Sequence, residues 1–386
     1  MLLKKDNWII KKIGEVCDVV GGSTPKTNNP QYWDGDNYWV TPAELDGKKW
    51  ISSTERTITE MGVKSARLQL LPSGTVLLSS RAPIGKVAIT TCPMYCNQGF
   101  KNLVCKKEVH NEFIYWLLLF SSEYLKSLGT GATFKEISKK VVEQIEIPIP
   151  PLSEQSRIVE ELDQLSNIIE KKRQQLSELD NLAQSIFYDM FGDPVTNAKG
   201  WEVKKLGEVC KTSSGGTPSK SHSEYYEGGY IPWLRSGEVN KMYIFNTELF
   251  ITEEGLMNSS AKWFPENTVV IAMYGATVGQ VGILRNMMTT NQAICGIFPN
   301  ESFIPIYLYH FLLSKKEEYI KLASGGAQPN ISQNIIKDTL VCYPPLSLQQ
   351  LFAQKIEAIE KEKELIKQSI KETEELFNSR MDYYFN

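Results

Sequence analysis

The sequence has 386 residues, a formal net charge of -3 and a hydrophobic fraction of 42%. This length is enough for two or three globular domains. The small net charge excludes a strong overall field that attracts polyanions, so any nucleic-acid site must be a local patch. The longest apolar run, 113–120, is too short to cross a bilayer. The seven dispersed cysteines and an N-terminus without a signal-peptide pattern predict a cytoplasmic chain with reduced thiols and no metal site.

The first part of the chain has mostly strand and turn signals. Short apolar or β-branched runs bounded by glycine and proline predict strands at 16–20 and 76–80. A helix is predicted over 113–128, and a glycine-containing loop follows it at 129–131. These elements indicate a mixed α+β domain over residues 1–151. Its loops are rich in small polar residues, and such loops on a rigid scaffold commonly carry binding.

A proline-led element follows, I-P-I-P-P-L-S-E-Q from Ile147. The prolines fix an extended segment, after which the spacing predicts one long helix, within a region 152–192 that Gly192-Asp193-Pro194 ends. Apolar residues at alternating steps of three and four predict a coiled-coil seam, and only Lys172 breaks it. The predicted seam residues are Ile158, Leu162, Leu165, Ile169, Leu176, Leu179 and Ile186.

The second half of the chain repeats the first at a spacing of 193–194 residues. Trp8-x-x-Lys-Lys-Ile-Gly-Glu-Val-Cys17 recurs as Trp201-x-x-Lys-Lys-Leu-Gly-Glu-Val-Cys210, and Gly22-Ser-Thr-Pro25 recurs as Gly215-Gly-Thr-Pro218. A second α+β domain is therefore predicted over 193–345, with strands at 268–272 and 281–284 and a helix over 304–322.

A second long helix is predicted over 346–386. Lys363, Thr373 and Arg380 interrupt its seam, whose predicted residues are Phe352, Ile356, Ile359, Ile366, Ile370 and Phe377. Two helices with the same apolar period can bury each other's stripes. The alternative is that each helix packs only against its own neighbouring domain.

Catalytic patterns are missing from the sequence. Neither glycine loop has the GxxxxGK[ST] spacing of a phosphate-binding loop. The three histidines lie outside GxSxG and HExxH patterns. Tyr343-Pro-Pro-Leu346 lacks the amide or carboxylate and the aromatic residue of the tetrapeptide that aminomethylases use. The sequence therefore predicts a non-catalytic chain that binds no cofactor of its own.

Three segments together carry a family resemblance: I-P-I-P-P-L-S-E-Q before the first long helix, M-F-G-D-P after it, and K-G-W-E-V-K-K-L-G-E-V followed by S-G-G-T-P-S. These segments and the internal duplication resemble the specificity (S) subunit of Type I restriction–modification systems, over essentially the whole chain. The resemblance implies two target-recognition domains, each reading one half of a split, asymmetric DNA sequence. It also implies that the two helices pack as an antiparallel coiled coil with pseudo-two-fold symmetry, and that they separate the domains.

The resemblance further implies partners for the chain besides double-stranded DNA. Two methyltransferase (M) subunits would dock on the helices, and restriction-translocase (R) subunits would complete a complex that cleaves DNA. S-adenosylmethionine, ATP and Mg would then belong to those partner subunits, which agrees with the lack of catalytic motifs here. No membrane contact is expected.

Candidate DNA-binding residues follow from the repeat and from the chemistry of DNA recognition, in which hydroxyl groups, loop amides and cations contact phosphates, while forked and amide side chains read bases. In the first domain they are Ser23, Thr24, Lys26, Arg81, Lys86, Asn97, Gln98, Lys101 and Lys135. In the second they are Thr217, Ser219, Lys220, Arg235, Tyr274, Gln280, Asn291, Gln292, Gln328 and Asn330.

Some of these residues could instead have a purely structural role. The Gly-x-Thr-Pro segment could form only a turn, and the Asn-Gln pair recurs in both copies, which favours a structural role for it. Tyr32, Trp33, Tyr225 and Tyr226 could stack on a displaced base, although aromatic residues at such places usually pack.

Two other classes of protein compete with a DNA-specificity subunit. One is a scaffold that bridges proteins through its coiled coil and never reads DNA. The other is a methyltransferase fused to a recognition domain, which is disfavoured because the two repeats use the whole length of the chain.

Overall fold

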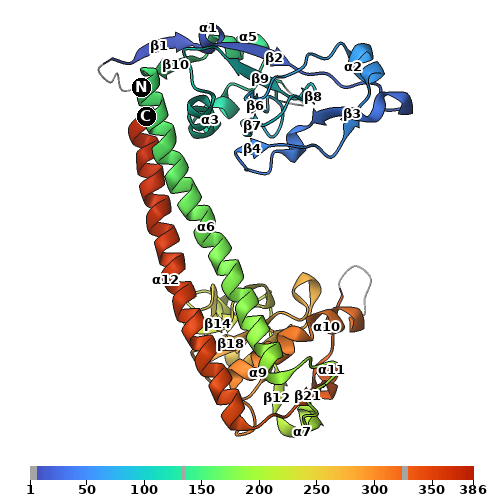
Figure 1. Cartoon of the computed structure of the whole chain (residues 1–386). Coiled ribbons are helices and arrows are strands. Elements are labelled where there is room, and N and C mark those ends of the chain that lie inside the picture. The colour runs from blue at the N-terminus through green and yellow to red at the C-terminus, as the bar shows by residue number, and fades with distance from the viewer. Residues whose placement is uncertain (1–6, 132–134, 324–328) are drawn as a thin grey trace. The chain divides into compact units, whose positions relative to one another are not determined.

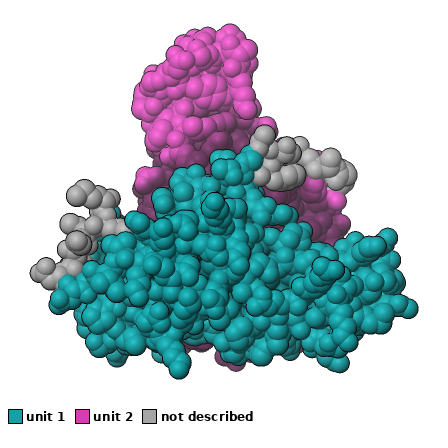
Figure 2. Space-filling model, turned by 90° about the horizontal axis from the view of Figure 1, so that it is seen from above, with its two compact units in different colours: residues 1–173, 368–386 teal, residues 174–367 magenta. Residues whose placement is uncertain are grey.

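A computed structural model describes residues 7–131, 135–323 and 329–386. The chain forms two compact units, which Figure 2 colours separately. Unit 1 contains residues 1–173 and 368–386, and unit 2 contains residues 174–367. Each unit therefore combines one mixed domain with part of both long helices.

The domain of unit 1 is built on a five-stranded sheet in the order β2-β9-β6-β7-β4, in which the β4–β7 pair is parallel. One face of this sheet packs against helix α3 (Asn111–Phe120) in the main core, and the other buries Val20, Leu77 and Ala88. The strands are β2 (Cys17–Gly21), β4 (Trp50–Ile51), β6 (Val76–Leu78), β7 (Val87–Thr90) and β9 (Lys101–Cys105).

A smaller three-stranded sheet, of which Figure 1 labels β3 and β8, extends the domain. Its strands have the order β5-β3-β8. Its strands are β5 (Thr57–Ile58), β3 (Trp33–Val40) and β8 (Tyr95–Cys96), and helix α2 (Glu60–Ala66) lies beside them. Trp33, Trp39, Ile58 and Tyr95 form a separate small core there. The ring centroids of the two tryptophans are 5.0 Å apart in an edge-to-face arrangement.

The domain of unit 2 repeats this plan. Its sheets have the orders β12-β20-β17-β18-β14 and β15-β13-β19-β16. The strands are β12 (Thr212–Ser214), β13 (Ile231–Leu234), β14 (Tyr243–Ile244), β15 (Leu249–Ile251), β16 (Trp263–Phe264), β17 (Val269–Ala272), β18 (Val281–Leu284), β19 (Met288–Thr290) and β20 (Ile294–Ile297). The shorter helices of the two units are α1 (Ile13–Val16), α5 (Lys139–Gln144), α7 (Leu206–Val209), α8 (Glu253–Met257) and α11 (Gln333–Asp338).

Each predicted domain helix is in fact two helices. The helix expected over 113–128 is interrupted at Ser121, between α3 and α4 (Ser122–Ser127). The helix expected over 304–322 is interrupted at the equivalent Lys315, between α9 (Pro305–Ser314) and α10 (Lys316–Leu322). After each interruption an apolar residue, Leu125 or Tyr319, is fully buried in the main core of its unit. The periodicity of the sequence did not reveal these interruptions.

The proline-rich segments before the long helices are extended, as expected, and each pairs with the strand that begins its domain. Strand β10 (Glu146–Ile149) is antiparallel to β1 (Ile9–Lys12), and β21 (Leu340–Cys342) is antiparallel to β11 (Val203–Lys205). Both pairs are two-stranded sheets, so Pro148 lies in an edge strand, where a missing N–H group is tolerated.

A buried glutamine joins each long helix to the domain before it. The side chain of Gln155 accepts a hydrogen bond from the His110 N–H (2.7 Å) and donates to the carbonyls of Glu108 (3.2 Å) and Pro150 (2.8 Å). Gln349 accepts from the Ile304 N–H and donates to Ser302 and Pro344 in the same way. Both side chains are fully buried and all their partners are backbone atoms, so the attachment is identical in the two units.

The two long helices, α6 (Leu152–Phe191) and α12 (Leu346–Phe385), run antiparallel within each unit. In unit 1 Lys172 donates to the Ser369 hydroxyl (2.6 Å), and Arg380 pairs with Glu161. In unit 2 Lys363 pairs with Asp180 (2.6 Å). The charged residues that interrupt the seams therefore have partners on the opposite helix. The predicted seam residues are all buried or half-buried.

Candidate nucleic-acid interface

The candidate residues of unit 1 gather where β2 and β6 end and β9 begins. Gly21 pairs with Lys101 across β2 and β9, and the Ser80 N–H donates to the Gly99 carbonyl (2.7 Å). The Ile137 N–H donates in turn to the Ser80 carbonyl (2.9 Å). Four loops, 22–26, 81–86, 97–99 and the segment at 135–136, therefore meet at one edge of the sheet.

Two tryptophans of the small aromatic core hold the Gly-x-Thr-Pro loop of unit 1 by hydrogen bonds. The indole N–H of Trp39 donates to the Ser23 carbonyl (3.1 Å), and that of Trp33 donates to the Lys26 carbonyl (3.2 Å). The Thr24 hydroxyl donates to the side-chain oxygen of Gln98. Lys26 remains exposed. The loop is thus a fixed platform that presents a cation, and Trp33 serves it by packing rather than by offering a free ring.

Unit 2 holds its loop with three similar contacts, but a tyrosine hydroxyl replaces the second indole and bonds to a different carbonyl. The Trp233 indole donates to the Gly216 carbonyl (3.0 Å), the Tyr226 hydroxyl donates to the Pro218 carbonyl (2.5 Å), and the Thr217 hydroxyl donates to Gln292. Ser219 and Lys220 lie next to this loop and are exposed. We call the residues that bond to this loop the loop frame: Trp33, Trp39 and Gln98 in unit 1, and Tyr226, Trp233 and Gln292 in unit 2. Both units therefore have such a frame.

The first glycine of each loop has no room for a side chain. A Cβ atom on Gly22 would lie 2.1 Å from the Asn97 carbonyl oxygen, and one on Gly215 would lie 2.1 Å from the Thr290 carbonyl oxygen. Both neighbours are backbone atoms, so the loop would have to move away from the strand.

We expect Gly22→Ala to displace this loop, to lower the free energy of unfolding by about 1–3 kcal/mol and to weaken DNA binding through unit 1. Denaturant unfolding and DNA titration measure the two effects. Gly237→Ala is the matched control, because a Cβ atom there meets nothing within 4 Å. A Gly22→Ala protein that unfolds and binds DNA like the wild type would contradict the assignment.

A charged cluster lies beside the platform in unit 1. Arg81 donates through Nε to Glu136 (2.8 Å), and the ammonium of Lys101 pairs with the other carboxylate oxygen of Glu136 (3.1 Å). Arg81 is exposed, whereas Lys101 and Glu136 are partly buried. Glu136 thus neutralises part of the positive charge of the cluster and fixes the orientation of the Arg81 fork.

The pKa of the Glu136 carboxyl reflects this environment. Partial burial would raise the pKa, but hydrogen bonds from Lys101 and Arg81 outweigh it and hold the pKa below its usual range. Because the folded-state pKa is depressed, the cluster stabilises the fold fully above the unfolded-state pKa of about 4.3. That contribution is lost as the pH falls through the folded-state pKa of Glu136.

We expect Glu136→Gln to release Arg81 and Lys101 for phosphate contact. The logarithm of the DNA affinity should then fall more steeply with the logarithm of the salt concentration, by about one unit of slope. Fluorescence anisotropy at several salt concentrations measures this slope. Asn330→Asp at the equivalent position of unit 2 is the converse control and should make the slope shallower. Unchanged slopes in both variants would show that this edge does not face DNA.

Unit 2 has different side chains on the equivalent backbone. Arg81 and Glu136 face each other in an isolated antiparallel bridge, and Tyr274 and Asn330 form the same bridge. Glu136 is therefore the counterpart of Asn330, and Lys135 corresponds to Pro329. Tyr274 and Asn330 are exposed. The Gln328 candidate lies outside the described residues.

Several candidates are engaged within the protein. The ammonium of Lys86 donates to the carbonyls of Leu45 (2.8 Å) and Pro42 (3.3 Å), and the Asn97 side chain accepts from the Gly99 N–H (2.8 Å). Arg235 pairs with Glu238 (3.2 Å) and Glu248 (2.6 Å). The counterparts Gln280 and Asn291 are partly buried. These side chains are engaged within the protein or partly buried. Of the remaining candidates, Lys26, Lys135, Lys220, Tyr274 and Asn330 are exposed.

Two residues that sequence reasoning missed belong to this edge. Glu136 is one, and its only signal was its position 194 residues before Asn330. The other is exposed Arg56, whose guanidinium carbon lies 3.6 Å from the centroid of the Trp33 ring. No spacing pattern in the sequence connects Arg56 with Trp33.

Within the described part of the chain, no group of three or more histidine, cysteine, aspartate or glutamate side chains is placed to hold a metal ion. Nor does any described helix combine the length and apolar character needed to cross a membrane.

Comparison with known proteins identifies the family. A model described as the Type I restriction modification DNA specificity domain matches residues 5–181 and 198–375. The Type I restriction enzyme MjaIX specificity subunit of Methanocaldococcus jannaschii is 34% identical over 371 residues, which cover 90% of this chain and 85% of that protein.

Two solved structures share the fold. A chain of a type I R-M system, solved in work on its complex assembly and conformational transition, aligns with a TM-score of 0.64 at 20% identity and covers 99% of this chain and 98% of its own. The S subunit of the Type-I restriction-modification system from M. genitalium aligns with a TM-score of 0.59 at 15% identity, covering 100% and 98%. With the specificity domain matched twice and one relative similar over nine-tenths of this chain, the protein belongs to the Type I restriction–modification DNA specificity family.

Proposed function

We propose that each unit reads one half of an asymmetric, bipartite site in double-stranded DNA. The observation that carries the proposal is the repeated loop frame with unlike side chains on it. Thr24 and Thr217 fix the two loops in the same way, while Arg81 stands where unit 2 has Tyr274. A shared frame serves the shared DNA backbone, and the differing side chains serve two different base sequences.

The chemistry of the two edges supports this division. In unit 1 exposed Lys26 and Arg81 offer cations, and an arginine fork suits the O6 and N7 acceptors of guanine. In unit 2 exposed Asn330 offers an amide, which suits adenine, and Lys220 offers a cation for phosphate. The two half-sites should therefore differ in sequence.

The chain would act within a larger cytoplasmic complex. We propose that the antiparallel helices set the spacer between the half-sites and dock two methyltransferase subunits, to which restriction-translocase subunits are added. In this scheme the chain itself is not an enzyme and holds no cofactor. S-adenosylmethionine, ATP and Mg would bind to the partner subunits.

Purified chain combined with its methyltransferase partner tests the proposal. The target is first identified by sequencing the methylated sites of the host with and without the gene. The complex should then bind a duplex carrying both half-sites, and binding should weaken when either half-site is scrambled or when the spacer changes by one base pair. Selective binding that falls with salt excludes a pure protein scaffold. Equal binding to all duplexes would overturn the proposal.

A further inference from the structure

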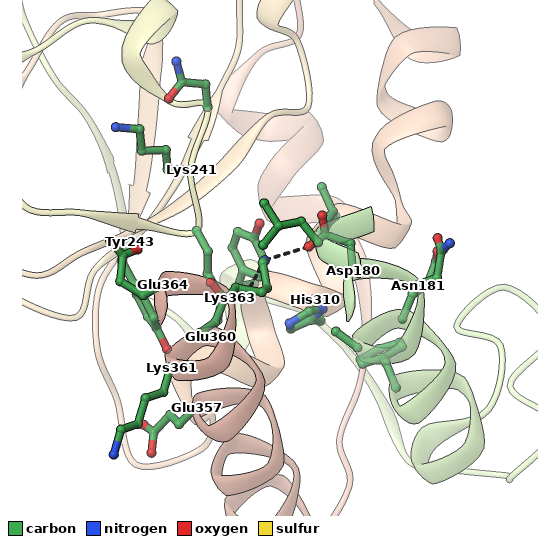
Figure 3. A pocket seen from close by; sticks show the side chains of 18 of the residues that line it. Asp180, Asn181, Lys241, Tyr243, His310, Glu357, Glu360, Lys361, Lys363 and Glu364 are labelled. Carbon is green, nitrogen blue, oxygen red and sulfur yellow. Dashed lines mark hydrogen bonds and ion pairs between the residues drawn. The ribbon is translucent and has the colours of Figure 1, made fainter. Parts of the chain in front are cut away.

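A cavity of about 1320 Å³ opens in unit 2, where α6 and α12 meet helix α9 and the segment 240–245 (Figure 3). Ala183 of α6 and both His310 and Ser314 of α9 line it. All of these elements belong to unit 2, so the cavity is a feature of this unit by itself.

The internal repeat shows which side chains the cavity lacks. Helix α3 is equivalent to α9 and helix α12 to α6, each with an offset of 194 residues. Unit 1 has Trp116, Phe120 and Phe377 where unit 2 has His310, Ser314 and Ala183. Three aromatic rings are thus replaced by three smaller side chains, and all three replacements line the same cavity.

In unit 1 those rings are packed and bonded. Trp116 and Phe377 lie 5.5 Å apart between ring centroids, and Phe120 lies 5.8 Å from Phe385. The Trp116 indole N–H donates to Asp163 of α6 (2.9 Å). The first unit therefore fills this place with its own aromatic side chains.

Ion pairs made by a lysine also fill the equivalent space in unit 1, and unit 2 has no lysine at that position. The ammonium of Lys49 bonds to Glu112 and Asp163 and lies 5.3 Å from the centroid of the Trp116 ring. The corresponding residue of unit 2 is Met242, which lines the cavity and carries no charge.

The cavity wall contains an unused polar atom. Nε2 of His310 is buried and has no hydrogen-bond partner among the described residues. Burial lowers the pKa of His310 to about 4, so the ring is neutral at neutral pH. A buried polar atom without a partner is costly, and a ligand that bonds to it would recover that cost. Nearby, Lys363 pairs with Asp180 and Glu360 (Figure 3) and does not compete for the atom.

We propose that this cavity is a socket for an aromatic side chain, tryptophan or tyrosine, of one methyltransferase subunit. The inference rests on the proposed function, since it names the place where that partner is anchored. The first unit shows what fits: a ring held between the helices, with one N–H group bonded to the wall. A partner's indole N–H or phenol hydroxyl would bond to His310 Nε2. Buried aromatic anchors in pockets commonly dominate the affinity of an interface.

The docking sites beside the two units would then differ in affinity for the methyltransferase subunit. Two identical methyltransferase subunits would meet an open socket beside unit 2 and an already filled place beside unit 1. The copy that inserts its aromatic side chain gains contacts that the other copy cannot make. One methyltransferase subunit should therefore bind more tightly than the other.

Filling the socket tests this inference. Ala183→Phe places in unit 2 the residue that unit 1 has at position 377, and Ser185→Phe is the matched control, because Ser185 is exposed and does not line the cavity. Native mass spectrometry and titration calorimetry with the methyltransferase subunit measure both binding steps. We expect Ala183→Phe to weaken the tighter step by about thirtyfold and to leave the weaker step and the control unchanged.

A second variant covers the case in which Ala183→Phe does not fold. His310→Phe removes the unpaired nitrogen and keeps a ring between Phe187 and Phe352, which contact His310 now; it should also weaken the tighter step. Equal affinities of wild type and variants would overturn the inference alone, and so would a loss confined to the restriction-translocase subunit. A wild-type chain that binds no methyltransferase subunit would overturn both this inference and the proposed function.

Discussion

Replacing residues 200–340 with the equivalent segment of another family member should change one half of the recognised DNA sequence and leave the other half unchanged. This segment carries the whole loop frame of unit 2, including Trp233 and Gln292, and none of the frame of unit 1. Sequencing of methylated sites in cells that express the chimera measures both half-sites. The original site should lose methylation by at least about tenfold, because several base pairs would no longer match.

The choice of donor segment matters for folding. Tyr307 and Phe311 are fully buried and belong to the core that unit 2 builds with α6 and α12. A donor with large apolar residues at these two positions should fold, and circular dichroism checks this before the DNA experiment. Exchange of the equivalent part of unit 1 is the reciprocal control and should change the opposite half-site. A chimera in which both half-sites change would refute the division of labour between the units.

Inserting seven residues into α6 near Lys172, and seven into α12 near Ser369, should lengthen the preferred spacer without changing either half-site. Seven residues nearly complete two helical turns, so the seam keeps its face. They add about 10 Å of helix, which corresponds to about three base pairs. The insertion lies where Lys172 bonds to Ser369 and Thr373, so the pair of helices is extended as a unit. Binding to a duplex series with graded spacers measures the shift.

A matched insertion into only one helix is the control. It would bring Lys172 or its partners opposite apolar residues, and the complex should lose stability rather than gain a longer spacer. If the double insertion altered the bases of a half-site, the helices would be influencing base reading as well as spacing.

Much of this architecture follows from local signals in the sequence. The repeat spacing, the proline-led segments and the heptad pattern predict two mixed domains and two long helices, and the helices observed at Leu152–Phe191 and Leu346–Phe385 agree. Strand β18 has the predicted bounds. The interruptions at Ser121 and Lys315 were not predicted, because apolar residues continue on both sides of each position and the buried Leu125 and Tyr319 lie beyond it.

The candidate interface is harder to predict because it is made of contacts between distant segments. The residues at its edge come from separate loops, and strand pairing brings Arg81 to Glu136, which lies 55 positions later in the chain. The sequence indicates that Lys86 and Arg235 are cations, but it does not reveal that backbone carbonyls engage the first and carboxylates the second. Whether a charged residue is free to meet DNA depends on these partners, and they are known only from the fold.

The glutamines at 155 and 349 bear on how such chains diversify. Each attaches its helix to the preceding domain through N–H and carbonyl groups alone, and every amino acid at those positions other than proline would supply the same N–H donor. An incoming domain of unrelated sequence can therefore keep these hydrogen bonds without a compensating substitution at either glutamine. Recombination between genes of this kind would then yield chains with new specificities that still fold where the apolar residues packed against the helices keep their size, because the hydrogen bonds of these glutamines are indifferent to the side chains exchanged.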